Sequence, residues 1–179
     1  MQFGLIDRIV ELERGRRIVA VKAVSRSEEY LADHFPTFPV LPGVLMLEAM
    51  VEAAGWLVRD AQDFARTVIL LKEAKNVTYK SFVGPGHALT LTVTCRRLAR
   101  DESEFLGVGH CGADEVVRGR FTLKHLPAEA AGPPREAERR NHQRARFASL
   151  CGAPIGNETS EPTETSANAA SPTQSQAEV

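Results

Sequence analysis

The 179-residue sequence lacks several features that mark particular classes of protein. Its formal net charge is only −1 at pH 7, so it has no excess of positive charge to attract nucleic acid or an anionic membrane surface. Its three cysteines, Cys95, Cys111 and Cys151, are odd in number and scattered. This spacing predicts neither a disulfide framework nor a metal cluster and favours reduced thiols. The histidines form no H-x-x-x-H pair, so we expect no metal site.

Long apolar runs are also scarce. The first residues, MQFGLIDRIVELERGRR, carry charges throughout and lack the apolar core of a secretion signal. The one candidate membrane span is DHFPTFPVLPGVLMLEAMVEAAGWLV, at residues 33–58. Its proline-rich entry and two glutamates, Glu48 and Glu52, favour a buried helix of a soluble protein instead. We therefore expect a cytoplasmic protein without a membrane segment.

The remaining pattern predicts one α+β domain. FGLIDRIVEL and RRIVAVKAV are partly alternating segments on either side of a turn at residues 13–16, which is typical of a hairpin. A short helix beginning at Ser27 and a long apolar helix beginning near Pro42 follow. Strands are then expected at residues 67–82, 87–99, 104–113 and 115–126. Turns this short exclude parallel crossovers, so the sheet should be antiparallel and should pack on the long helix.

The composition changes after Leu126. We assign residues 1–126 to the folded domain and residues 127–151 to an arginine-rich extension with a short helix. For the arginine run, a solvated helix face is favoured over contact with an acidic partner. Residues 152–179 are rich in Ser, Thr and Pro and hold no aromatic residue, so we expect them to be disordered. A chain cut after Leu126 is accordingly expected to keep its fold and most of its activity.

The apolar helix carries groups suited to chemistry on a carbonyl compound. A helix that begins near Pro42 presents free N–H groups, and Gly43 has no side chain to block an approaching oxygen. Glu48 lies among apolar residues, and such a carboxyl group has a raised pKa suited to a general acid. His34 is a candidate base near neutral pH. Each feature also has a structural reading: a loop histidine is usually solvated, and Glu52 is more typical of a partly solvated or interface glutamate.

The combination is more specific than its parts. The string HFPTFPVLPGVLMLEAM resembles the signature H-F-P-x-x-P-V-x-P-G-V-L-x-x-E-A-M of the 3-hydroxyacyl-acyl carrier protein dehydratases of the hot-dog fold. The resemblance covers roughly residues 3–126 and implies a curved antiparallel sheet wrapped around the long helix. Position by position, His34 matches the family's catalytic histidine and Glu48 its catalytic carboxylate. Gly43 matches the glycine whose N–H binds the thioester carbonyl.

The resemblance implies a lyase that dehydrates (3R)-3-hydroxyacyl thioesters to trans-2-enoyl thioesters in fatty acid, related lipid or polyketide biosynthesis. The substrate would arrive on the phosphopantetheine of acyl carrier protein, and no other cofactor is expected. The family's sites are shared between two subunits of a homodimer, and a trimer of dimers follows by analogy alone. The residues expected to bind substrate are Phe35, Pro42, Leu45, Met46 and Glu52.

Three positions depart from the family pattern: Asp33 and Thr37 stand where glycine is usual, and Glu52 replaces a usual glutamine. Restoring glutamine at position 52 is therefore expected to be tolerated. Two other readings stay open at this point. One is a hot-dog thioesterase in which Glu48 activates water, and the other is a non-catalytic module that binds acyl groups or a partner. Glu48 resembles the dehydration-only branch of the family, whereas the isomerising branch has aspartate. The acyl chain length does not follow from the sequence.

Overall fold

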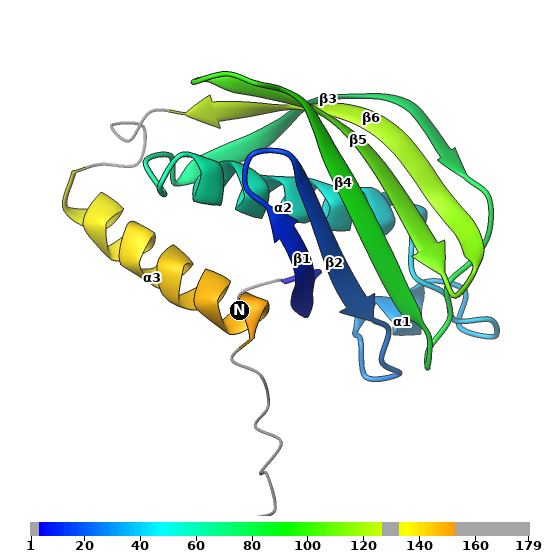
Figure 1. The fold of residues 1–179 in the computed structure, drawn as a ribbon. Helices are drawn as coiled ribbons and strands as arrows, with labels where there is room; N and C mark the ends of the chain where they lie inside the picture. The colour runs from blue at the N-terminus through cyan, green and yellow to red at the C-terminus, as the bar shows by residue number, and fades with distance from the viewer. Residues whose placement is uncertain (1–3, 127–132, 153–179) are drawn as a thin grey trace, which may run out of the picture.

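The computed structural model describes residues 4–126 and 133–152, in which a curved sheet wraps around one long helix (Figure 1). In chain order the elements are β1 (Arg8–Glu13), β2 (Arg17–Ala23), α1 (Tyr30–Asp33), α2 (Gly43–Ala61), β3 (Val68–Tyr79), β4 (Ala88–Leu98), β5 (Glu102–Cys111), β6 (Asp114–Leu126) and α3 (Pro133–Cys151). The six strands form one antiparallel sheet in the order β1-β2-β4-β5-β6-β3. This is the α+β arrangement that the sequence predicts.

The core lies between the concave face of the sheet and α2. Strand β4 alternates in burial, so that Leu89, Leu91 and Val93 are fully buried while the residues between them are partly exposed. Opposite the sheet, α2 contributes Met50, which is fully buried. A side chain at Gly107 of β5 would place its Cβ 2.4 Å from the Met50 sulfur. Glycine at this position therefore lets α2 lie close against the sheet.

Strand β3 forms one edge of the sheet and pairs only with β6. Most of its side chains are exposed, including Leu70 at 52%, Leu71 at 38% and Tyr79 at 45%. The opposite edge strand, β1, is contacted by α3 instead. A long edge strand with exposed apolar side chains is a template for pairing with another chain. Strand β3 is therefore the longer of the two edges and the one that α3 does not contact among the described pairs.

Helix α3 packs against the domain, and this overturns one expectation. Leu150 is 7% exposed and belongs to the hydrophobic core, and the ring of Phe147 lies 6.0 Å from Trp56 and 5.5 Å from Phe64. The helix keeps the solvated face expected for it, since most of its described side chains are exposed, but the expectation that the chain after Leu126 has nothing to pack with is wrong for this helix. Its composition is polar on average, but its few apolar side chains gather on the face that meets α2.

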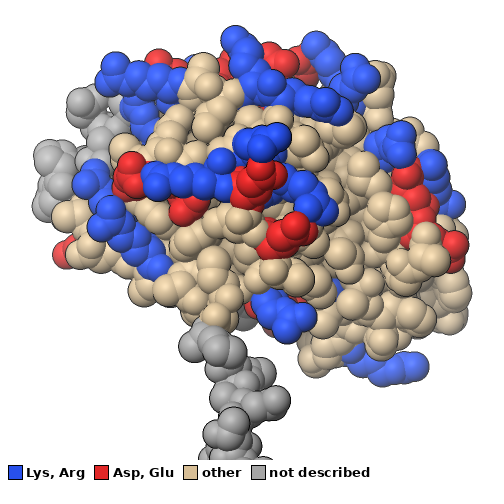
Figure 2. Space-filling view, viewed as in Figure 1, with Lys and Arg blue, Asp and Glu red and all other residues tan. Residues whose placement is uncertain are grey.

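The division of the chain at Leu126 stays a prediction. The expected disorder of residues 152–179 concerns a segment that lies, beyond Gly152, outside the described residues. Within the described ranges, no helix is both long and apolar enough to cross a membrane. Figure 2 shows basic and acidic side chains interspersed over the face that carries α3 and the β1–β2 hairpin. Ion pairs such as Arg17–Glu11 at 2.7 Å contribute to this mixed pattern.

Candidate active site

His34 lies at the point where α1 ends. It is the C-cap of that helix, and its backbone N–H donates to the carbonyl oxygen of Tyr30 at 3.1 Å. The next residue, Phe35, has a backbone φ of 52°, a left-handed conformation that residues other than glycine rarely adopt. The rings of His34 and Phe35 are 4.5 Å apart. The chain therefore turns sharply after His34, and strained backbone of this kind often occurs at functional sites.

Gly43 is the first residue of α2, and Pro42 is the N-cap. The N–H groups of Leu45 and Met46 both bond to the carbonyl oxygen of Pro42, at 2.9 and 3.2 Å. The N–H groups of Gly43 and the residue after it therefore precede the first intrahelical bonds and lie at the positive end of the helix dipole. A Cβ on Gly43 would lie 3.1 Å from the ring of Tyr79. The neighbourhood of this N–H thus has no room to spare for a side chain.

Glu48 lies in the second turn of α2, where its side chain is still open to solvent in the isolated subunit but is shielded on the side that meets protein. Partial burial raises the pKa of its carboxyl group, and the negative charge of Glu52 raises it further. Both causes oppose ionisation, because one removes water from the carboxylate and the other adds like charge. A carboxyl group that holds its proton more tightly is better suited to donate that proton near neutral pH.

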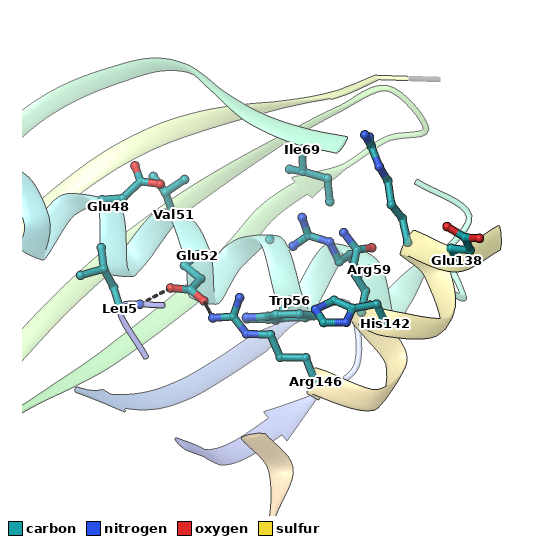
Figure 3. A pocket seen from close by; sticks show the side chains of 13 residues that line it. Leu5, Glu48, Val51, Glu52, Trp56, Arg59, Ile69, Glu138, His142 and Arg146 are labelled. Atoms are coloured by element: carbon teal, nitrogen blue, oxygen red, sulfur yellow. Dashed lines mark hydrogen bonds and ion pairs between the residues drawn. The ribbon is translucent and has the colours of Figure 1, made fainter. Parts of the chain in front are cut away.

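A cavity of about 570 Å³ lies between α2 and α3 and contains Glu48 (Figure 3). Leu5 and Ile69 complete a wall made mainly by the two helices. Helix α2 contributes Glu48, Val51, Glu52, Gly55, Trp56 and Arg59, and helix α3 contributes Glu138, Arg139, His142, Gln143 and Arg146. Five of the lining residues thus come from the arginine-rich segment that lies beyond the matched signature.

Glu52 connects α2 to α3. One carboxylate oxygen accepts from Arg146 at 2.7 Å, and the other accepts from the backbone N–H of Leu5 at 2.6 Å. The side chain of Glu52 is only 16% exposed. The favoured reading of Glu52 as a partly solvated or interface glutamate is compatible with this exposure, and the structure adds that its carboxylate ties α3 to the N-terminal segment. The family's usual glutamine could not form the ion pair, and the presence of α3 accounts for the departure.

The structure brings only some of the expected site residues together. Glu48 and Glu52 line the cavity, whereas His34 and Gly43 do not. Of the remaining residues expected to bind substrate, none lines this cavity: Phe35 is 58% exposed, Met46 is 2% exposed in the core, and Pro42 and Leu45 are half-buried. The cavity that contains the candidate acid in a single subunit is therefore not lined by the candidate base.

Three residues of the region were not identified from the sequence: Tyr79 beside Gly43, and Trp56 and Arg59 in the cavity. A helical pattern would have placed Glu48, Glu52, Trp56 and Arg59 on one face, since they follow one another by three or four residues. The sequence had no comparable pattern to indicate that residues of α3 line the cavity. Among the described residues, no group of three or more His, Cys, Asp or Glu side chains is placed to hold a metal.

Comparisons of the sequence with family models and with known proteins point to the same family. Residues 1–120 match the model of the FabA-like domain. The 3-hydroxyacyl-[acyl-carrier-protein] dehydratase FabZ of Symbiobacterium thermophilum is 40% identical over 131 residues, which cover 73% of this chain and 91% of the relative. The protein of the same name from Caldanaerobacter subterraneus subsp. tengcongensis is 35% identical over 127 residues, covering 71% of this chain and 89% of the relative.

Solved structures agree on the fold. A chain of the dehydratase heterocomplex ApeI:P from Xenorhabdus doucetiae superposes with a TM-score of 0.58 at 20% identity, covering 68% of this chain and 82% of that one. The conserved protein PA5202 from Pseudomonas aeruginosa gives a TM-score of 0.53 at 18% identity, with coverages of 66% and 87%. The hot-dog fold expected from the signature is confirmed. The match over residues 1–120 and the identity to near-complete relatives show that the chain belongs to the FabA-like family of 3-hydroxyacyl-acyl carrier protein dehydratases.

Proposed function

We propose that this protein is a lyase that removes water from 3-hydroxyacyl-acyl carrier protein to give the trans-2-enoyl thioester. The observation that carries the proposal is the carboxyl group of Glu48, which has a raised pKa and lies in a cavity large enough for an acyl chain. Glu48 belongs to the same signature as His34 and Gly43. Relatives that carry the name 3-hydroxyacyl-[acyl-carrier-protein] dehydratase are 35–40% identical to the chain over most of their length.

In the proposed reaction His34 takes the proton from the carbon next to the thioester carbonyl. The electron pair moves onto the carbonyl oxygen, where the N–H of Gly43 stabilises the negative charge. The pair then returns to form the carbon–carbon double bond as the bond from carbon 3 to its hydroxyl breaks. Glu48 gives its proton to the departing hydroxyl, so water leaves. His34 is left protonated and Glu48 ionised, and exchange with solvent restores both.

Two subunits supply the groups of one site in this proposal. The cavity of a single subunit contains Glu48 but neither His34 nor Gly43, so one chain does not assemble the acid and the base around it. Strand β3 offers an edge with exposed apolar side chains, which pairing with a second copy would cover. His34 and Gly43 of one subunit would then act with Glu48 of its partner. A trimer of such dimers stays a further expectation by analogy.

The substrate is proposed to arrive on the phosphopantetheine arm of acyl carrier protein, and the protein is placed in the cytoplasm. No metal or organic cofactor has a role in the mechanism, because the thioester itself acidifies the adjacent carbon. The family's subsites remain our assignment for Phe35, Pro42, Leu45 and Met46, whose side chains would line the tunnel only once the second subunit is in place. Glu52 contributes to the wall of the cavity through its contacts with Arg146 and Leu5.

One assay separates the proposal from its rivals. Purified protein is incubated with a 3-hydroxyacyl thioester, and enoyl product and free thiol are measured together. Dehydration yields the enoyl thioester without thiol, thioester hydrolysis yields free thiol, and a non-catalytic acyl-binding module changes neither. Release of thiol without enoyl product would replace the proposal by the thioesterase reading.

A further inference from the structure

The cavity beside Glu48 continues along α2 toward a group of buried polar atoms without partners. The side chain of Arg59 folds back toward Glu48, since its guanidinium nitrogen lies 2.9 Å from the Cβ position of Gly55. Gly55 is seven residues after Glu48, which corresponds to about 10 Å along a helix axis. In Figure 3, Glu48 lies at one end of the cavity and Glu138 of α3 at the other, with Arg59 between them.

Arg59 is partly buried, with its Nε shielded from solvent, and has no carboxylate within ion-pairing distance among the described residues. Its contacts are a long hydrogen bond to the carbonyl oxygen of Thr67 at 3.4 Å and the face of the Trp56 ring at 5.0 Å. The carboxylate of Glu52 is nearby, but Arg146 and the N–H of Leu5 occupy both of its oxygens. Two guanidinium groups thus share one carboxylate in the inner half of the cavity.

Other atoms of the cavity wall are also unsatisfied. Buried donors without partners are Arg59 Nε and Trp56 Nε1, and Gln143 Oε1 is a buried acceptor without one. Burial lowers the pKa of Arg59 to about 10, with Glu52 raising it and Arg146 lowering it, so the group stays charged at neutral pH. A largely shielded cation whose one nearby carboxylate is already paired, together with orphaned donors, costs stability unless a ligand satisfies these groups.

The charges of the whole lining support an anion at the inner end. Glu48 stands at the outer, catalytic end, and Glu138 and Arg139 are exposed at the rim on α3. Toward the inside, Arg59 and Arg146 face the single, already paired carboxylate of Glu52. An acyl chain that ends in a methyl group would leave this inner cluster unpaired. A chain that ends in a carboxylate would supply two acceptor oxygens for the guanidinium fork and for Trp56.

We propose that this cavity binds the far end of a 3-hydroxyacyl chain that carries a terminal carboxylate, with Arg59 as the main recognition residue and Trp56 and Arg146 as supporting donors. The inference rests on the proposed function, because it places the reacting end of the same chain at Glu48. Helix α3 completes the pocket, and Arg146 comes from it. Gln143 Oε1 can accept from a water molecule that accompanies the carboxylate.

The test compares two 3-hydroxyacyl pantetheine thioesters of equal chain length, one ending in a carboxylate and one in a methyl group. The full chain should show a kcat/KM roughly tenfold or more higher for the carboxylate-ended substrate, the scale of a hydrogen bond to a buried charge. Arg59→Met should lose that preference, because its kcat/KM for the carboxylate-ended substrate falls toward the value for the methyl-ended one. Arg144→Met is the matched control, because Arg144 lies on α3 against Phe64, outside the cavity, and should keep the preference.

A second measurement separates failure of this inference from failure of the proposed reaction. In the Glu48→Gln background, the carboxylate-ended thioester should raise the melting temperature more than the methyl-ended one, and adding Arg59→Met should abolish the difference. If neither substrate is dehydrated, the proposed function fails and this binding difference alone decides the inference. Equal melting shifts, or a preference that survives Arg59→Met, would overturn it. If Arg59→Met does not fold, Arg59→Lys replaces it as the test. Lysine keeps the positive charge but lacks the planar guanidinium fork, so the preference for the carboxylate-ended substrate should be reduced.

Discussion

At the scale of single residues, Glu48 and Glu52 divide two tasks that the sequence places one helical turn apart. Glu52 is held by Arg146 and the N–H of Leu5, so its charge is fixed in place. Glu48 has no such partners among the ion pairs and hydrogen bonds of the described residues, and its pKa is raised by partial burial and by Glu52. One carboxylate therefore anchors structure, and the other has a raised pKa and so holds its proton more tightly than an ordinary glutamate.

Glu48→Gln is expected to lower kcat for dehydration by about 10²–10⁴-fold, because the amide keeps the shape of the side chain and cannot donate the proton. Product formation under saturating substrate measures the effect, and an unchanged cooperative melting curve checks the fold. Activity close to that of the native protein would remove Glu48 from the mechanism.

Glu52→Gln should move the alkaline limb of the pH–rate profile toward lower pH. The charge of Glu52 is the second cause of the raised pKa of Glu48, after burial, so removing it lowers that pKa. If Glu48 must be protonated to act, activity is then lost at a lower pH than in the native protein. The substitution also breaks the ion pair to Arg146, so it is no longer expected to be neutral. Glu13→Gln, an exposed residue of the β1–β2 hairpin, serves as the control and should leave the profile in place.

At the scale of elements, α3 is the helix that lies beyond residues 1–120, the part of the chain that matches the family. It covers the face of α2 that carries Trp56, closes the cavity beside Glu48 and contacts the edge strand β1. The strand β3 at the other edge has no such cover within the described residues. The two edges of the sheet thus differ in what contacts them, and we expect β3, the longer edge with exposed Leu70 and Leu71, to pair with a second copy.

A chain cut after Leu126 should melt at a lower temperature than the full chain, in contrast to the expectation from composition. Loss of α3 removes the apolar contacts of Phe147 and Leu150 with the core, each worth about 1.5–3 kcal/mol when fully buried. Thermal unfolding of the cut chain is compared with that of a chain cut after Gly152, which keeps the helix. Equal melting temperatures for the two truncated chains would mean that α3 contributes nothing to stability.

At the scale of the whole molecule, the separation of His34 from the cavity of Glu48 points to a site completed by a second subunit. The prediction is tested with two inactive proteins, His34→Ala and Glu48→Gln, that are denatured together and refolded as a mixture. In each mixed dimer, one site carries both defects and the other carries none. Random pairing makes about half of the dimers mixed, so about a quarter of all sites should be native.

The control for this experiment is each variant refolded alone, which should stay inactive. If both residues served the same subunit's site, no mixed dimer would hold an intact one, and activity would remain at that background. Mixed dimers of differently tagged chains show whether the subunits exchange. If they exchange freely and no activity returns, the shared-site model is wrong.

Local patterns in the sequence were enough to determine the sheet, the long helix and the signature residues. The strand at β4, the turn at residues 13–16 and the start of α2 next to Pro42 all depend on neighbours close in the chain, and each was predicted. The position of Gly43 at a helix N-terminus follows for the same reason. The family resemblance added the roles of His34 and Glu48, which no local pattern assigns.

The tertiary structure decided what depends on residues far apart in the chain. Glu52 and Arg146 are separated by 94 positions, and Phe147 meets Trp56 across a similar distance, so neither contact has a signal in composition or periodicity. An arginine-rich segment reads as solvated because its average polarity hides a few apolar side chains on one face. Only the packed helix shows that Arg59 is partly buried without a carboxylate partner within ion-pairing distance among the described residues. The reason is physical: burial is a property of what surrounds a side chain, and the chain supplies those surroundings from distant segments.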